Sequence, residues 1–236
     1  MIPILERELM GYFLTATGYV FTGIFMLLSG ICYTMLNLAA RSGNMLYTLQ
    51  YMGYIWMLLC PVAVPRLLAG EYSRHTDTLL FSSPLSVTDI VAGKFLAAVC
   101  VMLTAVVLSL IFPVLTAVYG HLYLGETVAA YLGFIFQGIA YIAMDLFVSS
   151  FAANQISASA ACIGVNLFLW LADLISEAIS VPVLDSIFSF ISLYRRSVPF
   201  SAGRISLGSI VYFIAFIFIM CFLCVRVLDA RRWRNA

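Results

Sequence analysis

Residues 71–94 read EYSRHTDTLLFSSPLSVTDIVAGK and separate two long apolar stretches of the chain. Thr, Asp and Leu residues over 76–81 predict a short helix. It ends before Pro84, because the residue that precedes a proline is disfavoured in the helical region. Ser86 begins a Ser-x-x-Asp spacing just before an apolar run, close to a capping box, which predicts that a second helix starts there. We call residues 71–90 the elbow and expect it to be able to receive force from another protein.

The composition assigns the rest of the chain to a membrane. Hydrophobic residues make up 64% of the 236 residues and charged residues 10%, and the mean hydropathy is +1.06. A soluble domain carries about 25% charged residues, so this chain lacks the polar surface to coat a globule in water. Its net charge of +1 gives no nucleic-acid footprint. The six cysteines, including the C-x-x-C pair Cys221 and Cys224, fall in apolar segments, where we expect buried hydrophobes rather than disulfides or metal ligands.

Six apolar segments are long enough, or nearly long enough, to cross a bilayer, which takes about 20 residues. They fall at about 15–37, 52–70, 94–118, 128–149, 156–176 and 207–228. The stretch 2–12 comes before them and mixes Ile and Leu with Glu and Arg, which predicts an interfacial helix; a frayed tail is the alternative. The sequence therefore predicts one all-α integral membrane domain over 1–236 with six transmembrane helices.

The distribution of Lys and Arg predicts the orientation of these helices. With six spans, both termini lie on the same side. Placing them inside gives eight basic residues on the inner side: Arg7, Arg66, Arg74, Lys94, Arg226, Arg231, Arg232 and Arg234. The outer side then holds four: Arg41, Arg195, Arg196 and Arg204. The prediction is N-in and C-in, with the elbow in the cytoplasm.

Four residues inside the predicted spans are candidates for function. Pro61 and Pro65 lie in span 2, where they predict either a static kink or a bend that moves when the elbow is pushed. Asp145 lies in span 4 and Asp173 in span 5. Intramembrane carboxylates are functional-site candidates, and the alternative is that both acids are solvated at the nearby membrane surfaces.

The segment 177–206 is too apolar for an open loop and too interrupted to span the membrane. Pro182 and Pro199 break it, and its apolar runs have the length of re-entrant or interfacial segments. We expect one or two short re-entrant helices on the outer side, between spans 5 and 6, with arginines holding their ends at the surface.

The sequence lacks the motifs of covalent chemistry. Lys94, the single lysine, has neither the glycine-rich lead nor the following Ser or Thr of a phosphate-binding loop. The chain contains no Gly-x-Ser-x-Gly and no His-Glu-x-x-His. His75 and His121 are predicted on opposite sides of the membrane. We therefore expect no enzyme activity, no catalytic residue, no cofactor and no metal on this chain.

Three stretches resemble motifs of the membrane subunits of type-two ABC exporters, and the resemblance runs in order over nearly the whole chain. The similarity is greatest to the six-span branch of gliding-motility-type and peptide-exporter permeases. The matching residues of the opening are Glu8, Leu9, Tyr12, Phe13 and 18–21. Those of the elbow are Glu71, Thr76, Leu80, Pro84, Leu85, Ser86, Gly93, Lys94 and Phe95, with His75 where the family has glycine. Those of the joint between spans 4 and 5 are Ser149, Ser150, Asn154, Gln155 and Ala158.

The resemblance implies a permease in the plasma (inner) membrane of a prokaryote. Two such subunits, identical or homologous, would carry two ATP-binding subunits, which hold the ATP and Mg. The elbow would form a coupling helix that sits on the ATP-binding subunit, with these candidate residues: Glu71, Arg74, Thr76, Asp77, Leu79, Leu80, Pro84, Leu85 and Ser86. Substrate would pass between the two permeases, mainly along spans 2 and 5, with these candidates for the path: Pro61, Pro65, Asp145, Asn154, Gln155 and Asp173.

Two other classes of function stay open from the sequence. An ATP-independent secondary transporter or channel would need ionisable groups near the middle of the bilayer and an internal repeat. A non-transporting anchor would use ATP hydrolysis on a partner for assembly or motility. The 18 Phe and 13 Tyr favour an amphipathic or hydrophobic cargo, such as a peptide, lipid or drug, over a small ion.

Overall fold

The computed structural model describes residues 2–73, 86–179 and 192–235, and within these ranges every regular element is a helix. The elements follow one another in this order: α1 (Ile2–Phe13), α2 (Ala16–Tyr33), the π-helix η1 (Thr34–Leu38), α3 (Leu46–Ala63), α4 (Pro65–Ser73), α6 (Val87–Ser109), α7 (Ile111–Tyr119), α8 (Leu124–Ser149), α9 (Gln155–Ile179), α11 (Leu193–Ser201) and α12 (Leu207–Asn235). The all-α prediction is confirmed for the described residues.

Six helical segments are long and apolar enough to cross a membrane, as the sequence predicts. They are Ala16–Leu38, Leu46–Gly70, Val87–Tyr119, Leu124–Ser149, Gln155–Ala172 and Leu207–Arg232. The third begins seven residues before the predicted start at 94. The reason is the cap at Ser86, which starts α6 while the chain is still polar. The predicted N-terminal helix is α1, and the segment 177–206, where one or two short helices are expected, contains the short helix α11.

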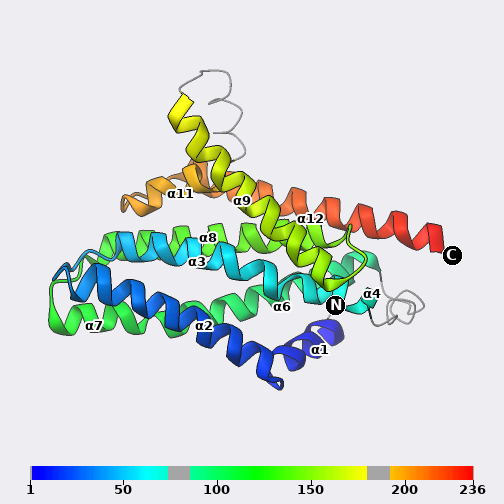
Figure 1. The fold of residues 1–236 in the computed structure, drawn as a ribbon, viewed down its shortest axis with the longest axis horizontal. Helices are drawn as coiled ribbons and strands as arrows, with labels where there is room; N and C mark the ends of the chain where they lie inside the picture. Colours follow the sequence, from blue (N-terminus) through cyan, green and yellow to red (C-terminus); the bar gives the residue numbers. More distant parts are fainter. Residues whose placement is uncertain (1, 74–85, 180–191, 236) are drawn as a thin grey trace.

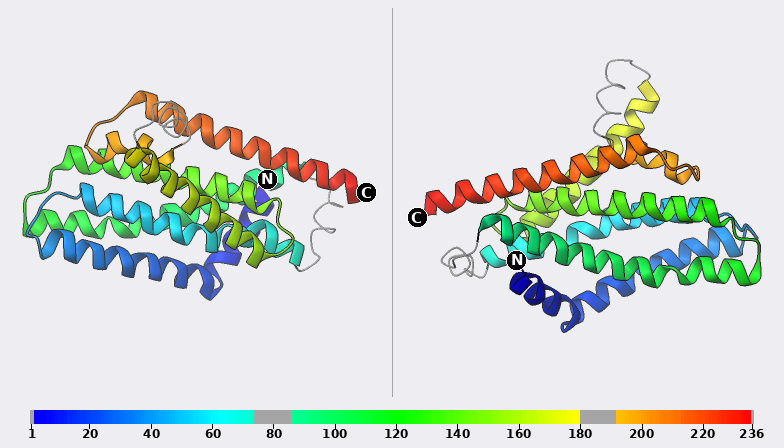
Figure 2. Two further views of the ribbon diagram at one scale, coloured as in Figure 1. Left: turned by 45° about the horizontal axis from the view of Figure 1, so that its top comes forward. Right: turned by 180° about the vertical axis from the view of Figure 1, so that it is seen from behind.

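Both termini lie at the same end of the molecule, beside α4 (Figure 1). The turns that follow η1 and α7 lie at the opposite end. Helices α2, α3, α6–α7 and α8 run side by side, α12 lies along α8, and α9 crosses the bundle at an angle (Figure 2). Helix α8 is central, since it packs against α3, α6, α9, α11 and α12. Sharing one end is what an even number of spans requires.

Aromatic side chains fill the middle of the bundle. The ring of Trp56 on α3 meets those of Phe21 and Phe25 on α2 edge-on, each at 5.6 Å between centroids. Phe25 also stacks on Phe134 of α8 at 6.1 Å. Because aromatic pairs at 4.5–7 Å add to the energy of burial, this cluster fixes α2, α3 and α8 relative to one another.

Prolines interrupt two of the spanning segments. Helix α3 ends at Ala63 and α4 begins at Pro65, a proline at a first helical position, where the missing N–H is not needed. In the third span, Leu110 separates α6 from α7, and Pro113 cannot bond the carbonyl of Ser109 four residues earlier. The Tyr131 hydroxyl of α8 donates to that carbonyl at 3.0 Å. A neighbouring helix thus satisfies the group that the proline leaves free.

Candidate functional site

The described residues on either side of the elbow show how it is attached to the bundle. Helix α4 runs from Pro65 to Ser73 and includes the backbone of Glu71, and α6 starts at Val87. Seven candidate residues for coupling lie outside the described residues: Arg74, Thr76, Asp77, Leu79, Leu80, Pro84 and Leu85. The predicted helix over 76–81 lies there too, so it stays a prediction.

The predicted cap at Ser86 is confirmed. The Ser86 hydroxyl accepts a hydrogen bond from the backbone N–H of Asp89 at 3.1 Å and donates to Asp89 Oδ2 at 2.5 Å. The residue has extended backbone angles, φ −72° and ψ 148°, as a residue before the first turn of a helix has. The end of the elbow is therefore fixed to the first turn of α6.

Ser86→Ala is expected to lower the free energy of unfolding by about 1 kcal/mol, the usual cost of losing a side-chain cap. Thermal unfolding in mild detergent measures this. Ser86→Thr is the matched control, because threonine keeps the hydroxyl and the cap. Equal stability of the alanine and threonine variants would show that the cap contributes nothing.

Lys94 joins both sides of the elbow to the N-terminal helix. Its side chain is 0% exposed, and its ammonium donates to Glu8 Oε1 of α1 at 2.9 Å and to the backbone carbonyl of Leu67 in α4. Lys94 itself lies in α6. One buried side chain therefore connects the helix that enters the elbow, the helix that leaves it, and α1.

The electrostatics of Glu8 match this arrangement. Burial raises the pKa of its carboxyl, whereas the Lys94 ammonium and the Arg7 guanidinium lower it. The two cations outweigh burial, and the pKa lies below the ordinary value of 4.5. Arg7 donates to the same carboxylate at 2.9 Å from a position that is 54% exposed, so Lys94 is the partner on the buried side. At neutral pH, Glu8 is thus a carboxylate bound to a buried ammonium.

Tyr12 fastens the other end of α1 to the break in span 2. Its hydroxyl donates to the Ala63 carbonyl at 2.8 Å, and its ring lies 5.9 Å from the guanidinium carbon of Arg66. Burial raises the pKa of Tyr12, which keeps the hydroxyl protonated and able to donate. Since Ala63 is the last residue of α3, this bond holds the span at the junction between α3 and α4.

The carbonyl that the first proline of span 2 leaves without a backbone donor has a polar partner on span 5. Pro61 has no N–H for the carbonyl of Met57, and Asn166 Nδ2 of α9 donates to that carbonyl at 3.2 Å. Asn166 is 1% exposed. Span 2 is therefore hydrogen-bonded to α9 one turn before Pro61, and α9 is one of the two spans that the resemblance gives to the substrate path.

Asp145 lies beside the hydrogen bond between Asn166 and Met57. The structure rules out one of the two alternatives that the sequence left open for this acid. Its side chain is 0% exposed, so it is not solvated at a membrane surface in this fold. Cys60, Cys162 and Asn166 surround the carboxyl, but among the described residues none meets hydrogen-bond geometry with either oxygen. The Asn166 Oδ1 atom is also buried and, among the described residues, has no hydrogen-bond partner. Spans 2, 4 and 5 thus meet around three buried acceptor oxygens.

The other path candidates lie apart from this cluster. Asn154 Oδ1 accepts a hydrogen bond from the backbone N–H of Ser157 at 2.8 Å, so the Asn154 side chain caps the N-terminus of α9. Gln155 is the first residue of α9, a helix that packs against α4. The backbone of Asp173 is helical, and its side chain lies outside the described part. It follows Gln155 by about 27 Å along the helix axis, at about 1.5 Å per residue. The structure thus places Asp145 beside Cys60, the chain neighbour of Pro61, whereas Pro65 begins α4, and Asn154 and Gln155 lie at the N-terminal end of α9.

Sequence reasoning missed two features of the structure: Asn166, and the buried ion pair between Glu8 and Lys94. An amide in an apolar span, one turn past a cysteine, is the sequence signal for Asn166, but its bond to the Met57 carbonyl is visible only in the structure. Among the described residues, no group of three or more His, Cys, Asp or Glu side chains is arranged to hold a metal ion.

Comparison with known protein families gives a match. The family model described as "ABC-2 family transporter protein" matches residues 47–207, more than half of the 236-residue chain. The matched part runs from the start of the second spanning helix to the start of the sixth. No curated protein matches the sequence.

Proposed function

Because the chain belongs to the ABC-2 transporter family, we propose that it is the permease subunit of an ATP-driven exporter and works with a separate ATP-binding subunit. The family match, over a region that contains spans 2 to 5, is the observation that carries this proposal. A membrane subunit of an ABC transporter is a transporter component and not itself an enzyme. ATP and Mg would be bound by the partner chain.

We propose that the elbow receives the motion of the ATP-binding subunit. Its support is the attachment of both flanks: Ser86 fixes the elbow to α6, and Lys94 bonds the α4 carbonyl of Leu67 from within α6. A force on the elbow would then move α4, α6 and α1 together. Because Tyr12 of α1 holds the Ala63 carbonyl, the same motion reaches the break in span 2.

The path for substrate is proposed between two permease subunits, along spans 2 and 5. Helix α9 supports this, because it presents exposed apolar side chains, with Phe168 at 64% and Leu171 at 47%. Such side chains suit an amphipathic or hydrophobic cargo. Asp145 and Asn166 lie behind this surface, where α9 meets span 2. In this proposal the N-in and C-in topology places the elbow in the cytoplasm of a prokaryote and α11 on the outer side.

Co-purification tests the proposal. The chain is tagged, expressed with its native neighbours, extracted gently and analysed by mass. An ATP-binding subunit is expected in stoichiometric amount. Leu80→Asp is expected to lower its recovery about tenfold, because the charge would remove an apolar contact from the interface between the two subunits. Ile205→Asp is the matched control: it puts the same charge on an apolar residue, 57% exposed, between α11 and α12.

The outcomes separate the possible functions. A second, different permease in the same preparation would make the complex a heterodimer. Equal recovery from Leu80→Asp and Ile205→Asp would remove the elbow from the contact. If the chain is isolated alone and moves solute into vesicles without ATP, the exporter proposal is wrong, and the buried Asp145 becomes the first residue to test for ion-coupled transport.

A further inference from the structure

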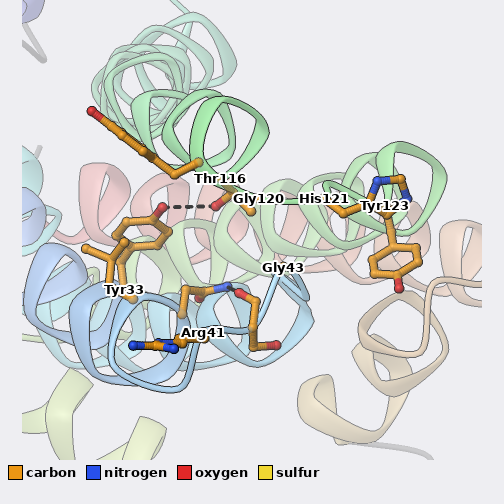
Figure 3. A pocket seen from close by; sticks show the side chains of 11 residues that line it. Tyr33, Arg41, Gly43, Thr116, Gly120, His121 and Tyr123 are labelled. Atoms are coloured by element: carbon orange, nitrogen blue, oxygen red, sulfur yellow. Dashed lines mark hydrogen bonds between the residues drawn. The ribbon is translucent and has the colours of Figure 1, made fainter.

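A pocket of about 460 Å³ lies at the end of the bundle far from the elbow. The turn after η1 and the turn between α7 and α8 form its walls (Figure 3). Its lining includes Arg41, His121 and three tyrosines, Tyr33, Tyr119 and Tyr123. No acidic residue is among the described residues that line it. Small-molecule sites have volumes of about 300–1,000 Å³, so the pocket has room for a small ligand or the head of a larger one.

The first wall is held rigidly by a buried amide. Asn37 belongs to the π-helix η1 and is 3% exposed. Its Nδ2 donates to the carbonyls of Ser42 at 2.9 Å and Asn44 at 3.0 Å, and its Oδ1 accepts from the Thr48 hydroxyl. Single π-helical turns are frequent at functional sites. Here the turn directs one side chain inward, and that side chain fixes the loop that carries Arg41.

The second wall is fixed against the first. Gly43 approaches the backbone of His121 so closely that any side chain at position 43 would overlap the His121 carbonyl. Below the two turns, the Tyr33 hydroxyl and the Thr116 hydroxyl are 3.0 Å apart and hydrogen-bonded, which joins α2 to α7 (Figure 3). The pocket is therefore formed before any ligand binds.

Arg41 gives the pocket its charge. Its backbone has φ 49°, and it is the one non-glycine residue with positive φ in the described part of the chain. A glycine would adopt this conformation without strain, and strained residues of this kind cluster at ligand sites. Arg41 is exposed, and no carboxylate is among the described residues that line the pocket. His121 and Tyr123 form an edge-on ring pair with centroids 5.3 Å apart, which adds polar ring edges on the other side.

We propose that this pocket binds a phosphate-type oxyanion, presented either by a lipid headgroup or by free phosphate. A guanidinium matches phosphate oxygens with two parallel donors, and the described lining adds hydroxyl and imidazole groups and contains no competing acid. The ends of membrane spans lie at the level of the headgroups, where tyrosines gather. The site does not depend on the proposed function, because it uses neither the elbow nor the substrate path.

Native mass spectrometry of the full chain in mild detergent tests the proposal with phosphatidylglycerol, phosphatidylcholine and inorganic phosphate as probes. The wild-type chain is expected to retain phosphatidylglycerol about tenfold better than Arg41→Gly does, since a charge-assisted pair is lost. Glycine also relieves the backbone at this position, so the variant is expected to be at least as stable as the wild type. Arg204→Gly is the matched control, because it removes another exposed arginine, between α11 and α12.

Each outcome decides the proposal. Retention of phosphatidylglycerol over phosphatidylcholine that depends on Arg41 and survives excess inorganic phosphate supports a lipid headgroup. Displacement of the lipid by inorganic phosphate, or phosphate binding that is lost in Arg41→Gly, supports a soluble source. Equal retention by wild type and Arg41→Gly, or an equal loss in Arg204→Gly, overturns the site.

Discussion

Glu8→Ala is expected to lower the free energy of unfolding by about 3 kcal/mol, because it removes one partner of a buried ion pair. The Lys94 side chain is 0% exposed and would lose the carboxylate that lies 2.9 Å from its ammonium. Its charge would then remain in an apolar environment with less compensation. Unfolding of the purified chain in mild detergent measures the effect.

Two further variants show whether the pair is the cause. Glu6→Ala is the matched control, since Glu6 is an exposed acid on the same helix, two residues earlier. The double variant Glu8→Leu with Lys94→Met is expected to recover most of the lost stability, because replacing both ions by apolar residues removes the uncompensated charge. A cost for Glu8→Ala no larger than that of Glu6→Ala would contradict the role of the pair.

The same pair predicts how stability depends on pH. The folded pKa of Glu8 lies below its ordinary value of 4.5. The carboxylate therefore contributes its full stabilisation above the unfolded pKa, and this contribution is lost as the pH falls through the folded pKa. Glu8→Ala is expected to weaken the dependence of the free energy of unfolding on pH in this acidic range. If the dependence is unchanged in the variant, other acids cause it.

Asn166→Leu is expected to cost about 2 kcal/mol, because it leaves the Met57 carbonyl buried without a donor. The rescue is specific. Pro61→Ala restores a backbone N–H four residues after Met57, so Asn166→Leu in that background is expected to cost less than about 1 kcal/mol. Chemical unfolding of the four proteins in the same detergent gives the coupling between positions 61 and 166.

Tyr131→Phe provides the control for this rescue. It removes the donor to the Ser109 carbonyl, which Pro113 leaves free in another span. Pro61→Ala is expected to leave the cost of Tyr131→Phe unchanged, since the two carbonyls are independent. If Asn166→Leu costs the same with and without Pro61, the amide does not replace the missing backbone bond.

Local and compositional signals in the sequence were enough to predict the helices. The six spans follow from the length of the apolar segments, and the cap at Ser86 follows from its spacing to Asp89. Both signals act over one helix, so no tertiary arrangement is needed to find them. The break between α3 and α4 follows in the same way from Pro61 and Pro65.

The groups that join the helices could not be predicted in this way. Lys94 and Glu8 are 86 residues apart, and Asn166 and Met57 are 109 apart. Lys94 fits an inner-surface charge by the positive-inside rule, and only the packing of α1 over α6 shows that it is buried. Asp145 lies four residues from the end of α8, a position that by sequence alone predicts contact with solvent. In the structure, α3, α9 and α12 pack against α8.

The two proline-freed carbonyls differ in when their partners are synthesised. The Ser109 carbonyl finds its donor on Tyr131, in the very next span, so the third and fourth spans can complete each other as a hairpin while the chain is still being made. The Met57 carbonyl depends on Asn166, three spans later. Until the fifth span enters the bilayer, the second carries an unbonded polar group, which is costly in lipid. We therefore expect membrane integration of this protein to have two stages, in which the second span is inserted early and reaches its final packing only when the fifth arrives.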